Sequence, residues 1–164
     1  MIESRNRGAA KRALVAIFAF TALTGAALAG ECPADKVVAD GKGQQMSKAA
    51  AKGVTDTVIG SIELANEAPR LADRKFRLRR LVIQPGGIVP WHSHDERPAM
   101  IYIVSGEINE YASNCTAPIA HRAGDVAREA KGTSHWWQNT GKQTVELISV
   151  DILPPQMKKD EKMM

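Results

Sequence analysis

From Val54 onward the chain consists of short apolar runs separated by Gly, Pro, Asn and Asp. Such runs are typical of β-strands joined by turns, and without long helical patterns they predict an all-β sandwich or barrel. The 164 residues are enough for a single compact domain. The expected strands lie at residues 54–64, 76–84, 100–104, 107–111, 126–129, 135–138 and 144–152.

These runs also predict the domain organisation. Residues 54–155 are expected to form the β domain. A small, polar, glycine-containing extension precedes it over residues 30–53, with a short helix expected at residues 44–52. Residues 156–164 are interpreted as a charged, flexible tail.

The first 29 residues have the pattern of a secretory signal peptide. Basic residues precede an uncharged apolar run at residues 13–29, which ends in the small-x-small sequence Ala27-Leu28-Ala29. Cleavage after Ala29 predicts a mature protein that begins at Gly30, in the periplasm or outside the cell. A retained membrane anchor is the alternative, because the run is just long enough to span a bilayer. Its Ala, Thr and Gly content, however, makes it only weakly hydrophobic.

The net charge of +4 does not indicate a nucleic-acid-binding protein. Four basic residues and one acidic residue lie in the first 12 positions, so cleavage leaves 18 basic against 17 acidic side chains. A protein so close to neutral lacks the electrostatic footprint of a nucleic-acid partner. A basic cluster remains in a strand-like segment, and we interpret it as a solvated strand face. It consists of Arg74, Lys75, Arg77, Arg79 and Arg80.

The two cysteines, Cys32 and Cys115, rule out a four-cysteine zinc site. Export would place them in an oxidising compartment, where a disulfide persists. The bond would close an 84-residue loop and stabilise the fold by roughly 4–5 kcal/mol in the chain-entropy model. Two unpaired thiols remain the alternative.

Three of the four histidines lie in two glycine-framed segments. His92 and His94 are two residues apart, so on a strand both imidazoles face the same side, with Cα atoms roughly 6.5–7 Å apart. That separation allows both rings to bind one metal ion. His135 lies in the second segment, between Gly132 and Asn139.

The two segments resemble the paired motifs of the cupin superfamily. The first family motif runs Gly, five residues, His-x-His, three or four residues, Glu, six residues, Gly. The second runs Gly, five residues, Pro-x-Gly, two residues, His, three residues, Asn. Eight of the ten positions agree, and the exceptions are Ala99 in place of Glu and Ala130 in place of Pro. The matching residues are Gly86, His92, His94, Gly106, Gly124, Gly132, His135 and Asn139.

The resemblance implies a double-stranded β-helix of the jelly-roll type, with a divalent metal ion held by His92, His94 and His135. The family typically uses the motif glutamate as a fourth, anionic ligand, which Ala99 cannot supply. Two interpretations stay open: a three-histidine site like that of cupin thiol dioxygenases, or a barrel that has lost its metal. We expect a metal, with iron first and manganese, zinc, nickel or copper as alternatives. Glu96 is a candidate substitute ligand, although a solvated or outer-sphere role is expected for it.

The remaining aromatic and histidine residues are assigned by strand parity. Trp137 shares a face with His135 and is predicted to line the pocket, whereas Trp91 and Trp136 face the opposite side. For at least two of the three tryptophans we expect packing in the core or at a homodimer interface. His121 lies outside both motifs and is expected at the surface or in a turn.

The leading hypothesis is an exported, metal-dependent, dioxygenase-like enzyme that acts on a small molecule, with an anion favoured. A non-catalytic module that binds a metal or small ligand, and a metal-free structural cupin, are the alternatives, because fold alone does not determine function. No nucleic-acid partner and no membrane anchor after cleavage are expected. No catalytic residue is identified beyond the three histidines.

Overall fold

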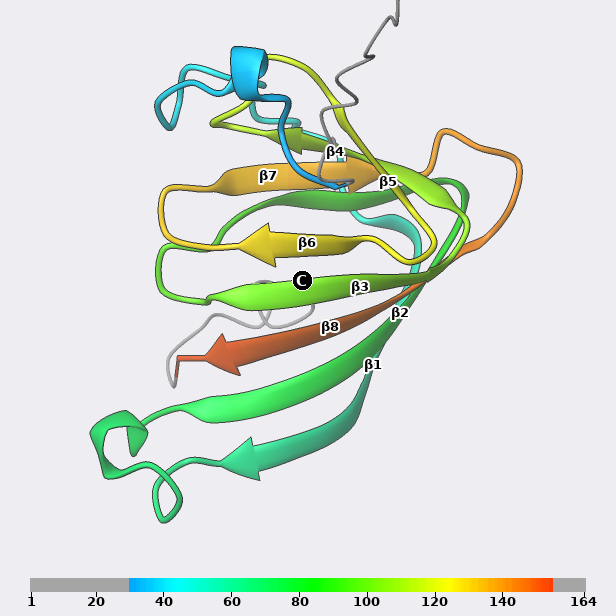
Figure 1. Ribbon diagram of the computed structural model, residues 1–164. Coiled ribbons are helices and arrows are strands. Elements are labelled where there is room, and N and C mark those ends of the chain that lie inside the picture. Colours follow the sequence, from blue (N-terminus) through cyan, green and yellow to red (C-terminus); the bar gives the residue numbers. More distant parts are fainter. Residues whose placement is uncertain (1–29, 155–164) are drawn as a thin grey trace, which may run out of the picture.

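Figure 1 shows the computed structural model of the protein, which describes residues 30–154. The predicted signal peptide and the predicted flexible tail both lie outside the described residues. The regular structure of the described chain is β-strand, apart from two single-turn 3-10 helices. The strands are β1 (Lys52–Glu63), β2 (Lys75–Ser93), β3 (Ala99–Ser105), β4 (Glu107–Ala112), β5 (Ile119–Arg122), β6 (Val126–Glu129), β7 (Ser134–Gln138) and β8 (Val145–Leu153), and the helices are η1 (Ala34–Lys36) and η2 (Pro69–Leu71).

The all-β prediction is confirmed, and each of the seven predicted strands has an observed counterpart. The prediction of a helix at residues 44–52 is wrong. The backbone N–H of Gln44 donates instead to the carbonyls of Ala112 and Cys115, both at 2.9 Å, so this segment is held by the turn after β4. The predicted strand at residues 76–84 continues to Ser93 as β2, and β5 was not predicted.

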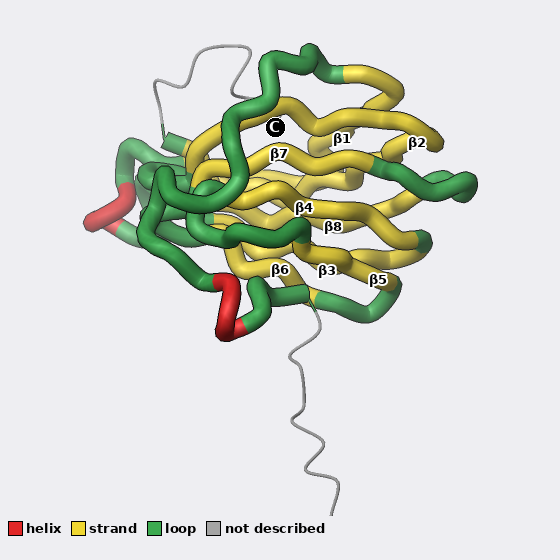
Figure 2. The backbone as a smooth tube through the Cα atoms, turned by 90° about the horizontal axis from the view of Figure 1, so that it is seen from above, coloured by secondary structure: helices red, strands yellow, loops and turns green. Residues whose placement is uncertain are grey.

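The two layers of the barrel share the long strand β2. Its first half pairs with β1 and β8, with Phe76 opposite Ile152. Its second half pairs with β7, with His92 opposite His135. The sheet order is β5-β4-β7-β2-β8-β3-β6, with β1 added beside β2. Figure 1 shows the two layers meeting where β2 bends, and Figure 2 shows the same strands from above. The result is a jelly-roll barrel.

Glycines with positive φ allow the tight connections between these strands. Gly106 has φ +84° in the turn between β3 and β4, and Gly124 has φ +95° in the turn between β5 and β6. L-residues with a side chain rarely adopt this conformation. The framing glycines of the sequence motifs are therefore explained by backbone geometry at these turns.

The barrel interior is filled by the inward-facing residues of both layers. Most of the core is apolar, and buried polar side chains lie around the histidines. Its apolar cluster consists of Leu81, Ile83, Val89, Ile101, Ile103, Ile108, Ala127, Trp137, Val145 and Leu147.

The basic cluster on β2 is not a solvated face, so that interpretation is wrong for two of its members. Arg77 and Arg79 are only 4% and 3% exposed, because they alternate along the strand in phase with buried Leu81. Arg77 binds Asp151 through Nε at 3.0 Å and Nη2 at 2.6 Å. A buried charge needs such a partner, and the carboxylates that supply it lie on the neighbouring strands.

The N-terminal extension is tied to the barrel beyond the end of β4. A disulfide joins Cys32 to Cys115, whose Cα atoms are 5.9 Å apart. Val37 forms a β-bridge with Cys115, and the N–H of Gly43 donates to the carbonyl of Ser113 at 2.7 Å. The extension therefore covers the turn between β4 and β5, as the blue and cyan segment at the top of Figure 1 shows.

The outer face of the layer formed by β1, β2, β8, β3 and β6 has several exposed apolar side chains. Among residues 30–154 no helix is long and apolar enough to cross a membrane. The exposed apolar residues on this face are Ile62, Phe76, Leu78, Met100, Tyr102, Val104 and Val126. The homodimer suggested by the sequence stays a prediction.

Candidate metal centre

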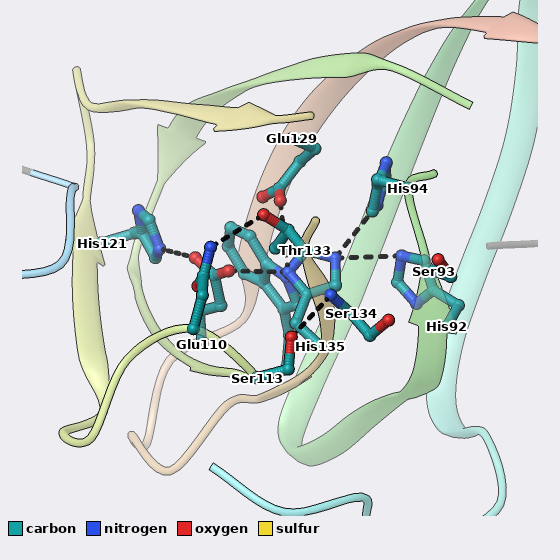
Figure 3. A network of polar contacts seen from close by, with 12 residues as sticks. His92, Ser93, His94, Glu110, Ser113, His121, Glu129, Thr133, Ser134 and His135 are labelled. Atoms are coloured by element: carbon teal, nitrogen blue, oxygen red, sulfur yellow. Dashed lines mark hydrogen bonds and ion pairs between the residues drawn. The ribbon is translucent and has the colours of Figure 1, made fainter. Parts of the chain in front are cut away.

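The structure brings the three motif histidines together. His92 lies near the end of β2, His94 immediately follows that strand, and His135 lies on β7 directly opposite His92. The Nε2 atom of His135 is 3.1 Å from Nε2 of His94 and 3.1 Å from Nε2 of His92. Figure 3 shows the three rings pointing toward one another. One metal ion could be held by this group.

Each of the three rings has an acceptor at its other nitrogen. Nδ1 of His92 donates to the Pro90 carbonyl at 2.9 Å, and Nδ1 of His94 donates to the Arg97 carbonyl at 2.7 Å. Nδ1 of His135 donates to Oε1 of Glu110 at 2.7 Å. A neutral imidazole protonated at Nδ1 has a lone pair at Nε2. Three lone pairs therefore converge on the same space.

The surroundings also keep two of these histidines, His92 and His94, neutral. Burial, followed by the neighbouring His135, lowers the pKa of His94 to about 3. Burial and the nearby His135 and His94 rings hold the pKa of His92 well below its usual value. A metal ligand must be deprotonated to bind, so neither ring has to lose a proton at neutral pH.

Behind His135 lies a second group of buried polar side chains, centred on Glu110 of β4. Its carboxylate accepts from His135 through Oε1 and from Nε2 of His121 through Oε2, both at 2.7 Å. The His121 ring stacks on Trp137 with the centroids 4.5 Å apart and an interplanar angle of 16°. The indole Nε1 of Trp137 lies 3.1 Å from Nδ1 of His135. This group holds His135 from the side opposite His92 and His94.

The prediction that His121 lies at the surface or in a turn is wrong. It is 0% exposed and lies on β5 at an inward-facing position, two residues after buried Ile119. A four-residue strand bounded by Pro118 and Ala123-Gly124 gives too little alternation to be recognised. In the sequence, only the two-residue spacing of Ile119 and His121 indicates that His121 shares the inward face of a strand.

A second carboxylate, Glu129 of β6, lies near the same ring. Its Oε2 is 3.3 Å from Nδ1 of His135, and its buried Oε1 has no hydrogen-bond partner. Burial and the charge of Glu110 hold the pKa of Glu129 well above its usual value. Burial opposes ionisation of Glu110 too, but its contacts with His135 and His121 lower its pKa to about 2. Glu110 is thus the anion of the pair and Glu129 its neutral partner.

Ala99 is buried at the motif position where the family has glutamate. On β3 it lies opposite Glu129 of β6 and Asp151 of β8. Both of these neighbours are buried, at 3% and 1% exposure. A glutamate at position 99 would add a third carboxylate between them.

A small cavity adjoins the histidines inside the barrel. Its volume is about 20 Å³, room for about one water-sized group. Arg79 lines it together with His92 and His94. Nη1 of Arg79 binds Asp56 at 2.5 Å, whereas its buried Nε has no hydrogen-bond partner. The other residues that line the cavity are Leu81, Val89, Ile101, Trp137, Leu147 and Ser149.

The other predicted residues fall on both sides of the barrel wall. Trp137 lines the cavity, as its parity with His135 predicted. Trp136 faces outward and stacks on Tyr111 at 4.2 Å between centroids. Glu96 is exposed in the loop after β2 and is not brought to the histidines. Asn139, the last motif residue, is fully buried and donates to the carbonyls of Ile83 and Gln143, so it supports the turn after β7.

A jelly-roll barrel with three convergent histidines inside it is the architecture of a cupin. The chain belongs to the cupin superfamily: the cupin domain family matches residues 79–151. The oxalate-binding protein of Thermotoga maritima is 34% identical over 96 residues, which cover 57% of this chain and 78% of that protein. The family resemblance seen in the sequence is thereby confirmed.

Solved structures show the same fold. A predicted oxalate decarboxylase from Thermotoga maritima is similar with a TM-score of 0.51 and 22% identity, covering 75% of this chain and 98% of that one. A protein from Thermus thermophilus is similar with a TM-score of 0.50 and 16% identity, covering 66% of this chain and 90% of that one. At these identities the similarity concerns the fold alone.

Proposed function

We propose that this cupin binds one divalent transition-metal ion through Nε2 of His92, His94 and His135. The observation that supports this most directly is the convergence of three Nε2 lone pairs, each fixed by an acceptor at Nδ1. Unprotonated nitrogens 3.1 Å apart repel one another, and a cation held among them removes that repulsion. Imidazole nitrogens suit zinc, copper, iron and nickel, so the ion is drawn from this group, with iron the expected one.

We further propose that the bound ion and Arg79 together hold a small carboxylate. Three neutral histidines leave the charge of the ion uncompensated and leave coordination positions open. Arg79 lines the same cavity and its buried Nε lacks a partner, so an anion within reach of that atom would satisfy it. The cavity of about 20 Å³ has room for about one water-sized group, so binding of a carboxylate there requires the lining side chains to move apart. The name of the oxalate-binding relative agrees with a two-carbon dicarboxylate.

Titration calorimetry tests the carboxylate proposal. Oxalate added to the metal-loaded protein should bind, and oxalate added to the chelator-treated protein should not. Arg79→Lys keeps the charge but removes Nε, and should weaken oxalate binding about tenfold, the loss of one charge-assisted hydrogen bond. Arg80→Lys is the matched control, because Arg80 lies on the outer face and pairs with Glu146. Equal oxalate binding with and without metal would contradict the proposal.

A dioxygenase-like activity is the second candidate, and Ala99 is the observation that favours it. Without a carboxylate ligand at that position, positions on a bound iron remain open for both dioxygen and a substrate. Oxygen uptake by the iron-loaded protein in the presence of small carboxylates and thiols should then exceed uptake by the zinc-loaded protein. Equal oxygen uptake by both forms would contradict the dioxygenase-like activity and leave only the binding role.

We also propose that the mature protein is exported and starts at Gly30. The charged, apolar and small-residue segments of residues 1–29 support this, as does the Cys32–Cys115 disulfide, since such bonds persist in oxidising compartments. Intact-mass measurement of the protein from a periplasmic fraction should give the mass of residues 30–164. A chain that keeps residue 1 and sediments with membranes would contradict export.

A further inference from the structure

Glu110 occupies a position that the cupin motifs do not explain. It lies on β4, opposite Trp137 of β7, and only 4% of its surface is exposed. Each of its two carboxylate oxygens accepts a hydrogen bond at 2.7 Å, from His135 on one side and His121 on the other. Figure 3 shows Glu110 between these two rings. A carboxylate held at both oxygens has no freedom to turn away from the ligand.

The three ligand histidines differ in what holds their Nδ1 atoms. His92 and His94 donate to backbone carbonyls, which are neutral. His135 donates to a carboxylate. A carboxylate acceptor fixes the tautomer and orientation of the ring and makes Nε2 more basic. Among the described residues, His135 is therefore the ligand whose donor strength depends on a neighbouring negative charge.

The carboxylate of Glu110 lies close to the site where the motif glutamate, replaced here by Ala99, would have supplied a negative charge. Ala99 cannot place a carboxylate on the ion, and its cross-strand neighbours are the buried acids Glu129 and Asp151. Glu110 lies one imidazole ring away from the position of the ion. We propose that Glu110 is a positioning residue that fixes the Nδ1–H tautomer of His135 and supplies, through that ring, the negative charge that Ala99 cannot supply. This inference rests on the metal site proposed above.

Glu129 provides an internal comparison. It is as buried as Glu110, but its Oε2 lies 3.3 Å from Nδ1 of His135, against 2.7 Å for Glu110. Its Oε1 has no partner, whereas both oxygens of Glu110 are hydrogen-bonded. The geometry therefore assigns the role to Glu110, and Glu129→Gln is a matched control for Glu110→Gln.

Cobalt binding tests the charge, because the visible spectrum of Co²⁺ reports its ligand geometry. The parent should bind one Co²⁺ per chain, and Glu110→Gln should raise the Kd about 10- to 100-fold, the usual effect of losing such a partner. Glu129→Gln should change the Kd less than about threefold. Ala99→Glu should tighten Co²⁺ binding by a larger factor in the Glu110→Gln background than in the parent, and no purely structural role of Glu110 explains such a difference. Equal Kd values for the parent and Glu110→Gln, or equal losses in the two Gln variants, would overturn the inference.

The tautomer is tested without any metal. Long-range ¹H–¹⁵N spectra of the chelator-treated parent should show His135 protonated at Nδ1 and bare at Nε2, and the same in Glu129→Gln. His135 protonated at Nε2 in the parent would overturn the inference, whatever the metal results. If the parent binds no cobalt at all while this tautomer is present, the metal site fails and the positioning of His135 by Glu110 stands by itself.

Discussion

At the scale of single residues, the site is defined less by its three histidines than by the atoms behind them. The spacing of His92, His94 and His135 was readable from the sequence because strand parity places the first two on one face. The acceptors that bind their Nδ1 atoms could not be predicted. Glu110 precedes His135 by 25 residues and lies on another strand, and the other two acceptors are backbone carbonyls. Any residue can supply a backbone carbonyl, so the residue type does not reveal such a hydrogen bond.

Stability of the metal-free protein should fall as the solution is acidified below pH 6.5. His94 has a pKa near 6.5 in the unfolded chain and about 3 in the fold, so between these values only the unfolded chain binds its proton. The free energy of unfolding should therefore be lower at pH 5 than at pH 7, by about 2 kcal/mol from His94. Urea denaturation at both pH values measures this loss. In His94→Asn the loss should be smaller by that amount, and an unchanged loss would contradict the burial of a neutral His94.

Ala99→Glu should have opposite effects in the two metal states. Without metal, the new carboxylate lies between Glu129 and Asp151 and should destabilise the protein by about 1–3 kcal/mol. With a divalent ion, it becomes an anionic ligand, and the Kd for Zn²⁺ should fall at least about tenfold. Ala99→Gln, which has the same size without the charge, is the control for both measurements. A tighter Kd in Ala99→Gln as well would assign the effect to packing rather than charge.

At the scale of elements, the strands were predictable where alternation and turn residues coincide. The strand at residues 126–129 was predicted to the residue, because Gly124-Asp125 and the following Ala130-Lys131-Gly132 delimit it. β5 was missed because it is four residues long, and the continuity of β2 was missed because Pro85-Gly86-Gly87 is a turn sequence. In the fold these residues lie where β2 passes from one layer to the other, so tertiary pairing overrides the local signal.

Gly106→Ala should destabilise the turn between β3 and β4. Gly106 has φ +84°, and an added Cβ would lie 2.9 Å from Cγ2 of Val145, so both strain and contact oppose it. We expect a loss of about 1–2 kcal/mol in the free energy of unfolding. Gly60→Ala on β1 is the control, since nothing lies within 4 Å of its Cβ position, and it should be neutral or stabilising by about 0.5 kcal/mol. Similar losses at both positions would contradict the turn geometry.

At the scale of the whole molecule, the disulfide fastens the N-terminal extension to the barrel across a separation of 83 residues. Replacing both cysteines, as Cys32→Ser with Cys115→Ser, should lower the free energy of unfolding by about 4 kcal/mol in the chain-entropy model. Urea denaturation of the parent in reducing buffer should give the same value as the double variant. A parent whose stability does not respond to the reductant would contradict the bond.

The fold class and the family followed from the sequence because they depend on spacing, which folding preserves. The ionic interior did not, because β-strand parity is the same for a solvated arginine and a buried one. Arg79 is recognised as internal only once Asp56 and Asp151 are placed around it. The buried pair of Glu110 and His121 was hidden for the same reason, since its partners come from different strands.

Metal analysis followed by calorimetric titration tests the central claim most directly. Protein purified without an affinity tag and then stripped with a chelator should bind one divalent ion per chain, and His94→Ala should raise the Kd at least about 100-fold, since one of three ligands is lost. Circular dichroism should show that the variant keeps its β-structure, so that the loss belongs to the site. No measurable binding of Zn²⁺, Co²⁺ or Fe²⁺ by the stripped parent, or equal binding by His94→Ala, would contradict a metal centre formed by His92, His94 and His135.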